Sequence, residues 1–528
     1  MTPDFIIVGG GTAGGVLAES LTRSGRTRVL LLEAGGEASS PFTRIPAGFA
    51  ELFRSRYDWR FDSEPVAAAG GRRVFIPRGR MLGGCSNINA MIHQWCHPAD
   101  FDAWSALGAT GWTWKDVAPH LAAQESWQGA GGSPARGRSG PLVASPNPNA
   151  SQLSHVFVEA ARTAGLRGPA DYNGGEDYVG AWMCQLAVKG GRRFSAYQAV
   201  LAPARGRANL EIRTGAQVAR VVIAHGRATG VVLRRGATEE TVAATRGVIV
   251  AAGAFGSPQV LQHSGIGPAD VLQRAGVAVV RASGGVGANL QDHPSAGVLV
   301  RTRSTDTYKR AQSVRELLRY VLRRRGLLAS NIAEAAAFAR TGVTGDAAPD
   351  VELLFAPVEW RNEGLEKPRV HAFTIAVIGL APRSRGTVRI RSADPLAPPA
   401  IDLALLSDPA GVDARVLCEG TRLARRIAQS APLAAECLEE MEPGVAVTTD
   451  EQMLAAIAPR LQTLYHPTST CAMGGPEAVC DPSLRVRGVD GLWVCDASVM
   501  PTVPRGHPHA VVAMIARRGA EMIARSAS

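Results

Sequence analysis

The sequence predicts an α/β protein in which a doubly wound parallel sheet is interrupted by a second domain with an antiparallel sheet covered by helices. The apolar runs 5–8 and 29–32 flank a glycine-rich turn and a helical stretch. A third apolar run, 248–252, ends in small residues, as strands do where ligands of such sheets bind. Alternating segments at 351–355, 373–378 and 387–390, within about 351–405, indicate antiparallel strands. The following stretch, to about 440, is expected to be helical and Arg-rich.

The turn after the first strand, residues 9–14, has the glycines of a dinucleotide site. Gly9 lets the chain turn tightly, Gly11 lets the backbone approach a pyrophosphate, and Gly14 lets the helix pack closely on the strand. The helix N-terminus offers unpaired amides to the phosphates. Glu33, which ends the second strand, stands where a carboxylate binds ribose hydroxyls. The context favours a Rossmann-like dinucleotide site over an ordinary glycine-rich turn, but it does not separate FAD from NAD.

Length and composition describe a globular protein of several domains. A chain of 528 residues exceeds one compact domain, and 46% hydrophobic with 20% charged residues is ordinary for folded proteins. The net charge of +11 comes almost wholly from arginines scattered along the chain. We therefore interpret it as compositional bias, and we do not expect a nucleic-acid partner.

One basic segment, 301–325, stands apart from the rest. Within it Val314, Leu317, Leu318, Val321 and Leu322 recur at helical spacing among arginines, which predicts an amphipathic helix. We expect its apolar face to cover a core and its basic face to be solvated. A membrane-surface or partner-binding role is the alternative, and membrane association is not expected.

The eight cysteines form neither CxxC pairs nor a dense framework, which predicts reduced, structural thiols. The N-terminal residues do not resemble a secretory signal, and no apolar run reaches the roughly 20 residues that span a bilayer. We expect a cytoplasmic protein. The Gly-, Ser- and Pro-rich segment 126–148 is predicted to be a loop, with a lid as one interpretation.

Histidines gather near the C-terminus, at Tyr465-His466-Pro467 and Gly506-His507-Pro508-His509, without the spacing of metal ligands. No metal is therefore expected. A dinucleotide at one end of the chain and imidazoles at the other suggest redox chemistry.

Several long segments carry a resemblance to a known family: 79–89, 253–267, 285–293, 465–467 and 496–498. In this order they resemble the glucose-methanol-choline (GMC) family of FAD-dependent oxidoreductases, in its branch of choline-dehydrogenase-like proteins and alcohol oxidases. The resemblance covers essentially the whole chain. It implies a Rossmann-like FAD-binding domain in three parts, 1–155, 201–298 and 455–528, interrupted by a substrate domain in two parts, 156–200 and 299–454.

The resemblance also implies a set of FAD-binding residues. In chain order they are Gly9, Gly11, Thr12, Ala13, Gly14, Glu33, Ala34, Gly84, Asn89, Ala90, Met91, Ile92, Val218, Tyr465, Asp496, Ala497, Pro508 and His509. Some relatives join the flavin covalently to a histidine, and the matching position here is Ile88. Non-covalent FAD is therefore expected.

The implied reaction is oxidation of a primary alcohol to an aldehyde, with His466 as base and His507 as partner, although the two imidazoles can exchange roles. His509 is expected to contact the flavin, and His93, His97, His263 and His293 are expected to be structural. Oxygen or another acceptor would reoxidise the flavin, so oxidase and dehydrogenase both stay open. An FAD-containing lyase or decarboxylase on the same scaffold is the alternative. Choline is disfavoured, because the sequence does not reveal the aromatic cage and carboxylate that bind a quaternary ammonium.

Overall fold

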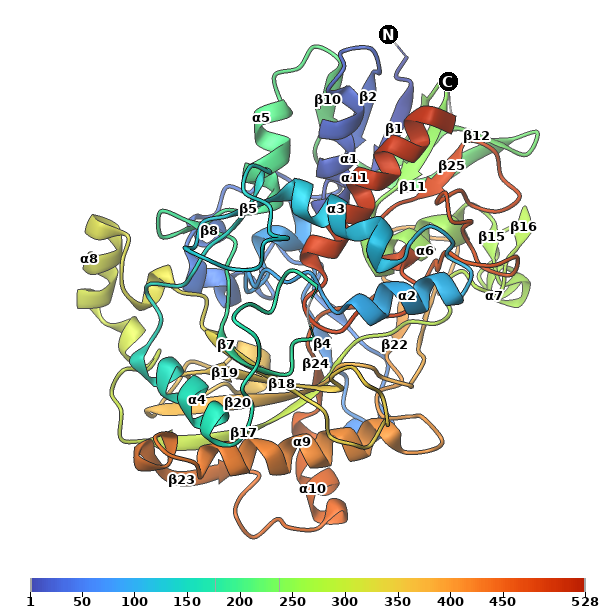
Figure 1. The fold of residues 1–528 in the computed structure, drawn as a ribbon. Helices are drawn as coiled ribbons and strands as arrows, with labels where there is room; N and C mark the ends of the chain where they lie inside the picture. Colours follow the sequence, from blue (N-terminus) through green and yellow to red (C-terminus); the bar gives the residue numbers. More distant parts are fainter. Residues whose placement is uncertain (1, 176, 237, 527–528) are drawn as a thin grey trace.

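The computed structural model describes residues 2–175, 177–236 and 238–526, and it confirms the mixed α/β architecture (Figure 1). A five-stranded parallel sheet has the order β10-β2-β1-β14-β25. Its strands are β1 (Phe5–Val8), β2 (Val29–Leu32), β10 (Leu210–Arg213), β14 (Gly247–Val250) and β25 (Leu492–Val494). The predicted strands at 5–8, 29–32 and 248–252 are therefore present and lie side by side.

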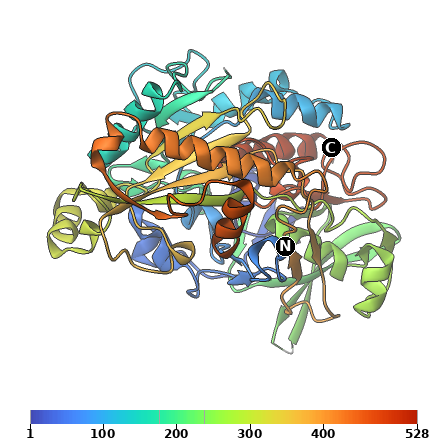
Figure 2. The ribbon, with the colours of Figure 1, turned by 90° about the horizontal axis from the view of Figure 1, so that it is seen from below.

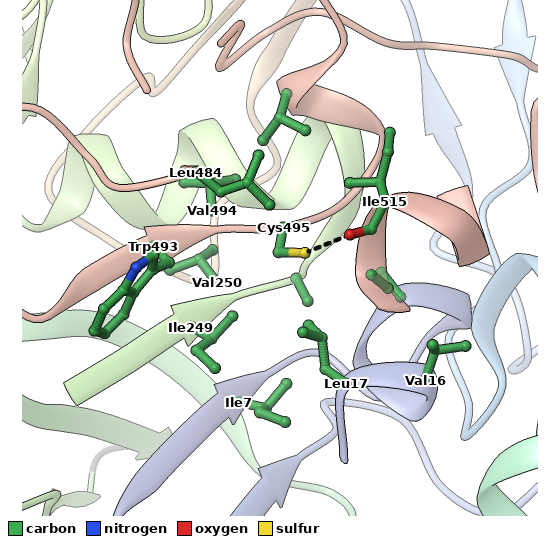
Figure 3. Close-up of a cluster of buried hydrophobic side chains, with 14 of the residues drawn as sticks. Ile7, Val16, Leu17, Ile249, Val250, Leu484, Trp493, Val494, Cys495 and Ile515 are labelled. Atoms are coloured by element: carbon green, nitrogen blue, oxygen red, sulfur yellow. Dashed lines mark hydrogen bonds between the residues drawn. The ribbon is translucent and has the colours of Figure 1, made fainter. Parts of the chain in front are cut away.

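Helices follow the two central strands at their carboxyl ends. After β1 comes α1 (Thr12–Thr22), and after β14 comes α6 (Gly253–His263). The C-terminal α11 (His509–Ser526) packs against α1. Figure 3 shows how apolar side chains from β1, β14, β25, α1 and α11 fill the space between sheet and helices. Ile7, Leu17, Ile249 and Val494 are buried there, and Cys495 lies 3.7 Å from the carbonyl oxygen of Ile515.

The second sheet is antiparallel, with the order β23-β17-β20-β19-β18-β7 and with β24 also paired to β17. Its strands are β7 (Gly180–Met183), β17 (Pro294–Thr302), β18 (Ala335–Ala339), β19 (Val351–Ala356), β20 (Ala372–Gly379), β23 (Cys437–Glu442) and β24 (Gln462–Thr463). On it pack α4 (Gln152–Thr163) and α9 (Val412–Ala428), and Figure 2 shows α9 crossing the sheet. The predicted antiparallel sheet covered by helices is thus confirmed.

Smaller elements complete the described chain. The strands β11 (Gln217–Ala224), β12 (Arg227–Arg235) and β13 (Thr238–Ala243) form a three-stranded sheet. Short strand pairs are β3 (Phe61–Asp62) with β4 (Phe75–Ile76), β5 (Glu125–Trp127) with β6 (Leu142–Ala144), β8 (Val188–Lys189) with β9 (Arg192–Arg193), β15 (Ile266–Gly267) with β16 (Arg281–Ala282), and β21 (Thr387–Arg389) with β22 (Ala400–Asp402). The other α-helices are α2 (Pro98–Ala106), α3 (Trp114–Gln124), α5 (Ala202–Ala204), α7 (Ala269–Arg274), α8 (Val314–Arg323) and α10 (Asp450–Ile457).

Two expectations need correction. The helical stretch expected from about 405 to 440 forms as α9 but ends at residue 428, and β23 adds an edge strand from Cys437. The amphipathic helix at 314–323 forms as α8, but its apolar side chains are exposed instead of covering a core.

The domain boundaries stay a prediction. β17 runs across the expected boundary at 298/299, and β24 lies beyond the one at 454/455. Residues 1, 176, 237, 527 and 528 of these segments lie outside the described residues. All eight cysteines are free thiols. In the part of the chain that the structure describes, no helix combines the length and the apolar character needed to cross a bilayer.

Candidate active site

A cavity of about 660 Å³ runs along the carboxyl ends of β1, β2 and β14 and reaches the antiparallel sheet. With one exception, every residue predicted to bind FAD lines it, and so do His466 and His507. The exception is Gly14, which lies behind the cavity. Strands β1 and β14 are neighbours from which the chain leaves toward opposite flanks of the sheet, so the cavity opens at the switch point of the topology, where doubly wound sheets bind ligands.

The glycine turn fits a closely approaching ligand. Gly9 has φ of 106°, and a side chain there would place Cβ 2.5 Å from the carbonyl oxygen of Ala251. A Cβ on Gly14 would lie 1.8 Å from the carbonyl oxygen of Gly9, so this glycine brings α1 onto β1. A Cβ on Gly11 would meet protein no closer than 4.0 Å, at Gly84, so it would take up cavity space. The unfilled side of Gly11 and the N-terminus of α1 together form a cradle for a pyrophosphate.

Glu33 closes the same end of the cavity. Its carboxylate accepts hydrogen bonds from the backbone amides of Gly10, at 2.8 Å, and Gly35, at 2.7 Å. Burial raises the pKa of Glu33 to about 7, against these two hydrogen bonds and the charge of Arg80. Each carboxylate oxygen has a second lone pair, so the side chain can also accept hydroxyl groups of a ribose.

The segment around Asn89 borders the middle of the cavity. Asn89 Oδ1 accepts from Arg193 Nη1 at 2.7 Å and from the backbone amide of Met91 at 3.1 Å. Met91 has a positive φ of 60°, which its neighbours enforce. Ile88 lines the cavity and is buried among apolar side chains. The side chain at the position of covalent attachment is thus an aliphatic one.

Asp496 holds a further turn at the cavity. Its carboxylate accepts from the amide of Gly253, at 2.8 Å, and from Ser257 and Ser498, both over short contacts of 2.5 and 2.6 Å. Asp496 thereby ties the start of α6 to the loop that carries Ala497. Pro508 and His509 follow at the start of α11, where burial lowers the pKa of His509 to about 4.

His466 and His507 face each other, with ring centroids 5.0 Å apart and an interplanar angle of 84°. Burial lowers the pKa of His466 well below its ordinary value, and the charges of His507, His293 and Arg78 lower it further. The backbone amide of His466 donates to Asp292 Oδ1 at 2.8 Å. Its Nε2 has no hydrogen-bond partner among the described residues. The arrangement therefore leaves a neutral imidazole nitrogen available at the cavity.

His293, expected to be structural, is a direct neighbour of His466. The two Nδ1 atoms lie 3.1 Å apart. Burial lowers the pKa of His293 to about 3, so its ring is neutral. The contact comes from β17 and β24, whose pairing sets Pro294 opposite Thr463 and thus brings residues 293 and 466 to the same end of the sheet. Asp292 Oδ1 accepts from the amides of both histidines and fixes their backbones.

Glu352 is another residue that sequence reasoning missed. It lies on β19 with a fully buried side chain, and its Oε1 is 2.9 Å from His507 Nε2. The amide of His507 donates to Gln94 Oε1 at 3.1 Å. From the sequence alone, Glu352 is recognisable only as a polar residue within an apolar strand. A buried acid in that setting is the signal that could have pointed to it.

The other histidines have different surroundings. His93 Nε2 lies 2.8 Å from Glu125, deep in the protein, and the ring of His97 caps α2, so both have structural contacts. His263 lines the cavity, and burial lowers its pKa to about 4. The segment 126–148 is not wholly a loop, because β5 and β6 take up parts of it. Among the described residues none of this segment lines the cavity, and Arg136 anchors it to Glu125 and Asp171, so the lid interpretation stays a prediction.

Beyond Tyr465 the cavity wall is aromatic. Phe53 packs edge-on to Tyr465 at 6.1 Å and to Phe49 at 5.9 Å, and Phe49 contacts Trp360 at 6.3 Å. All four line the cavity. The nearby carboxylates are already paired, Glu363 with Arg72 and Glu442 with Arg361 and Arg460. Within the described residues no group of His, Cys, Asp and Glu side chains has the arrangement of a metal site.

Two sequence models of the GMC oxidoreductase family match the chain, over residues 3–295 and 382–516. An uncharacterized GMC-type oxidoreductase of Mycobacterium tuberculosis is 39% identical, with 98% of this chain and 99% of that protein covered. An oxygen-dependent choline dehydrogenase of Rhizobium johnstonii is also 39% identical, over 99% of this chain and 96% of that one.

Among solved structures, pyridoxine 4-oxidase from Mesorbium loti superposes with a TM-score of 0.89 at 32% identity, covering 98% of this chain and 99% of that chain. The similarity extends over the parallel sheet, the antiparallel sheet and the cavity between them, so it is not confined to the nucleotide motif. The chain therefore belongs to the GMC oxidoreductase family and is an FAD-dependent oxidoreductase that acts on CH–OH groups.

Proposed function

We propose that the protein oxidises a primary alcohol to an aldehyde, with His466 as the base and His507 as its partner. The observation that carries this proposal is the pair of nearly perpendicular imidazoles at the cavity, one of which has an unbonded Nε2. Bound FAD supplies the acceptor for the hydride that leaves the alcohol carbon. The hydroxyl proton passes to Nε2 of His466, so loss of one proton and one hydride leaves the aldehyde.

The contact with His293 supports His466 as the base. Both rings are neutral, so a hydrogen bond between their Nδ1 atoms requires that one ring carries its proton on Nδ1 and the other on Nε2. If His466 donates this hydrogen bond and His293 accepts it, Nε2 of His466 is left bare toward the alcohol. The same hydrogen bond becomes charge-assisted once His466 has taken the hydroxyl proton. His293 would thus select the tautomer of His466 that has a free Nε2, and it would stabilise the imidazolium that His466 becomes on taking the hydroxyl proton.

His507 fits the role of partner. Glu352 and Gln94 hold it by its Nε2 and its backbone amide, which leaves its second ring nitrogen for the substrate oxygen. A ring held at two points is suited to orienting the alcohol. Each ring thus keeps one nitrogen without a partner among the described residues, Nε2 of His466 and Nδ1 of His507, so the assignment of His466 as base follows the family resemblance and its contact with His293.

The aromatic wall supports an uncharged alcohol with an aromatic or other apolar body. Phe49, Phe53 and Trp360 offer apolar surface, and the carboxylates beside them are occupied by arginines. The same aromatic side chains could also contact a quaternary ammonium, so choline is kept in the alcohol panel as the comparison for uncharged alcohols. The similar proteins are named for choline and pyridoxine, both of which carry a primary alcohol group.

FAD is proposed to be held without a covalent bond. Ile88 offers no nucleophilic atom at the position where a linking side chain would stand. Denaturation by heat or acid should therefore release intact FAD into the supernatant, and flavin that stays with precipitated protein would contradict the proposal. The cytoplasmic location stays a proposal as well. Reoxidation of the flavin by oxygen or by another acceptor is also proposed.

Rapid mixing without oxygen tests the reaction. Aromatic, furanic, aliphatic and amino alcohols should bleach the flavin at different rates, with aromatic alcohols fastest. His466→Ala should slow bleaching by roughly 10² to 10⁴-fold with FAD still bound. His507→Asn should be milder, since an amide can still form a hydrogen bond to the substrate hydroxyl group, and the double variant should lose less than the sum of the two free-energy changes.

Two results would overturn this proposal. Near-normal bleaching by His466→Ala together with an inactive His507→Asn would reverse the roles of the two histidines. If no alcohol of the panel reduces the flavin, the reaction is one without net dehydrogenation of an alcohol, as in an FAD-containing lyase or decarboxylase.

A further inference from the structure

Helix α8 is amphipathic, and it exposes the apolar face that amphipathic helices of globular proteins normally bury. Its five large apolar residues are exposed by 72, 49, 52, 51 and 76%, respectively: Val314, Leu317, Leu318, Val321 and Leu322. The spacing i, i+3, i+4, i+7 and i+8 places them on one face. The buried residues of the helix are Glu316 and Tyr320, which lie on another side. This single helix carries five of the thirteen large hydrophobic side chains that are exposed in the described part of the chain.

Exposed arginines lie on α8 and just after it, and Arg315 borders the apolar face. Arg315, Arg323 and Arg325 are exposed, and the described residues provide no ion-pair partner for them. The charges of Arg324, Arg192 and Arg44 reach Tyr320, which places two further exposed arginines beside the helix. The helix has one acidic residue, Glu316, and it is buried and close to Arg310 and Arg319. The surface therefore combines apolar area with an excess of positive charge.

The position of α8 leaves this surface accessible. In both views the helix projects at the edge of the molecule, away from the parallel sheet and from α9 (Figures 1 and 2). It is followed by a turn, η7 (Leu327–Ala329), that packs on η2 (Pro46–Leu52). η2 carries Phe49 of the aromatic cavity wall. A flat partner could thus approach α8 without meeting the rest of the fold.

We propose that α8 and its neighbouring arginines form a docking surface for anionic lipid bilayers. The helix lies in the plane of the interface, with its valines and leucines among the acyl chains and its guanidinium groups at the level of the phosphates. Ten residues of helix are too short to cross a bilayer, so the contact is peripheral.

Charge complementarity favours a lipid surface over a second copy of the chain. Another α8 would bring the same arginines and no exposed carboxylate to neutralise them. An anionic bilayer meets both needs at once, because it offers phosphates to the cations and hydrocarbon to the leucines. This assignment replaces the expectation that the apolar face covers a core of the protein itself.

The test uses the FAD-loaded protein and two kinds of vesicle, phosphatidylcholine alone and phosphatidylcholine mixed with phosphatidylglycerol. We expect the protein to cosediment with the anionic vesicles, and less so as salt is raised. Leu318→Glu with Leu322→Glu, and separately Arg323→Glu with Arg325→Glu, should each weaken this binding at least tenfold. Val280→Glu is the matched control and should leave binding unchanged. Val280 is 56% exposed and directly precedes β16, which Figure 1 shows at the opposite edge of the molecule from α8.

Folding and catalysis provide the internal checks. No residue of α8 lines the cavity, so these variants should keep their FAD absorbance, melting temperature and rate of flavin reduction. Failure of the native protein to bind anionic vesicles would overturn the proposal. So would equal binding to both vesicle types, or an oligomer that Leu318→Glu with Leu322→Glu splits into monomers while the native protein ignores lipid.

Discussion

At the scale of the residue, the proposed role of His466 depends on the hydrogen bond between its Nδ1 and that of His293. If His293 Nδ1 accepts that hydrogen bond, His293→Leu should slow anaerobic flavin reduction about 10- to 100-fold, because a hydrogen bond to a charged group contributes about 1.5–3 kcal/mol. His293→Asn should restore most of the rate, since its amide oxygen can replace the lost acceptor. Stopped-flow bleaching with a fast alcohol measures both.

Melting temperature and FAD content separate this effect from general damage. Both variants remove a buried ring, so both are expected to lower the melting temperature, whereas only His293→Leu should lower the rate strongly. Equal rates in the two variants would show that His293 acts by packing and has no influence on the proton.

The low pKa of His466 predicts a particular pH dependence. Its pKa lies well below the ordinary value of about 6.5, so the ring stays neutral, and able to accept a proton, when the solution is made mildly acidic. The rate of flavin reduction should therefore be constant from about pH 8 to pH 6 and fall only at lower pH. A rate that falls with a midpoint at or above about pH 6.5 would show that this base has an ordinary pKa.

At the scale of the element, the sequence correctly predicted helices and strands whose residue pattern lies within the element itself. The apolar runs and glycines at 5–14 specify β1 and α1, and both form almost where expected. By contrast, β18 consists of Ala335–Ala339, a sequence of high helix propensity that becomes a buried strand between β7 and β19. Pairing with the neighbouring strands determines that this segment is a strand, so the helix propensity of its residues could not predict it.

The same limit explains which site residues the sequence missed. His466 and His507 belong to recognisable motifs, whereas the contact of His293 with His466 depends on pairing between β17 and β24. Glu352 likewise reaches His507 from a strand 155 residues away in sequence. Non-local pairing of this kind leaves no periodic signal along the chain.

Close packing of α1 on β1 yields a prediction for that element. A methyl group on Gly14 would lie 1.8 Å from the carbonyl oxygen of Gly9, so Gly14→Ala must push the helix away from the strand. We expect it to lose more than about 3 kcal/mol of unfolding free energy and most of its FAD. Urea unfolding and flavin absorbance would measure the two losses.

Gly15→Ala is the matched control in the same helix. Its Cβ would meet Leu201 Cβ at an ordinary 3.4 Å, and alanine favours a helix over glycine by about 1 kcal/mol. The variant should thus be as stable as the native protein or more so. Equal stability of Gly14→Ala would mean that α1 can shift freely, contrary to the packing argument.

At the scale of the whole molecule, the two sheets meet at the cavity proposed to hold FAD. Residues from the parallel sheet and from the antiparallel sheet both line it. The sequence predicted both sheets and the cofactor, but their relative placement comes from contacts such as His507 with Glu352 on β19 and Tyr178 with the carbonyl of Arg505, which join segments more than 150 residues apart. Bound FAD should therefore raise the unfolding free energy of the part with the parallel sheet and of the part with the antiparallel sheet.

This coupling gives a prediction that also tests Glu33. FAD at 100 times its Kd should add about 2.7 kcal/mol to the unfolding free energy of the stripped protein, so the melting temperature should rise with FAD concentration. Glu33→Ala removes a charged acceptor worth about 1.5–3 kcal/mol and should need roughly 10- to 100-fold more FAD for the same rise.

Glu37→Ala is the control, because Glu37 pairs with Arg205 at the exposed surface and is absent from the cavity wall. Thermal melts of the three proteins over a range of FAD concentrations decide between the outcomes. If Glu33→Ala follows the same curve as the native protein, its carboxylate serves only the amides of Gly10 and Gly35 and takes no part in holding the ribose.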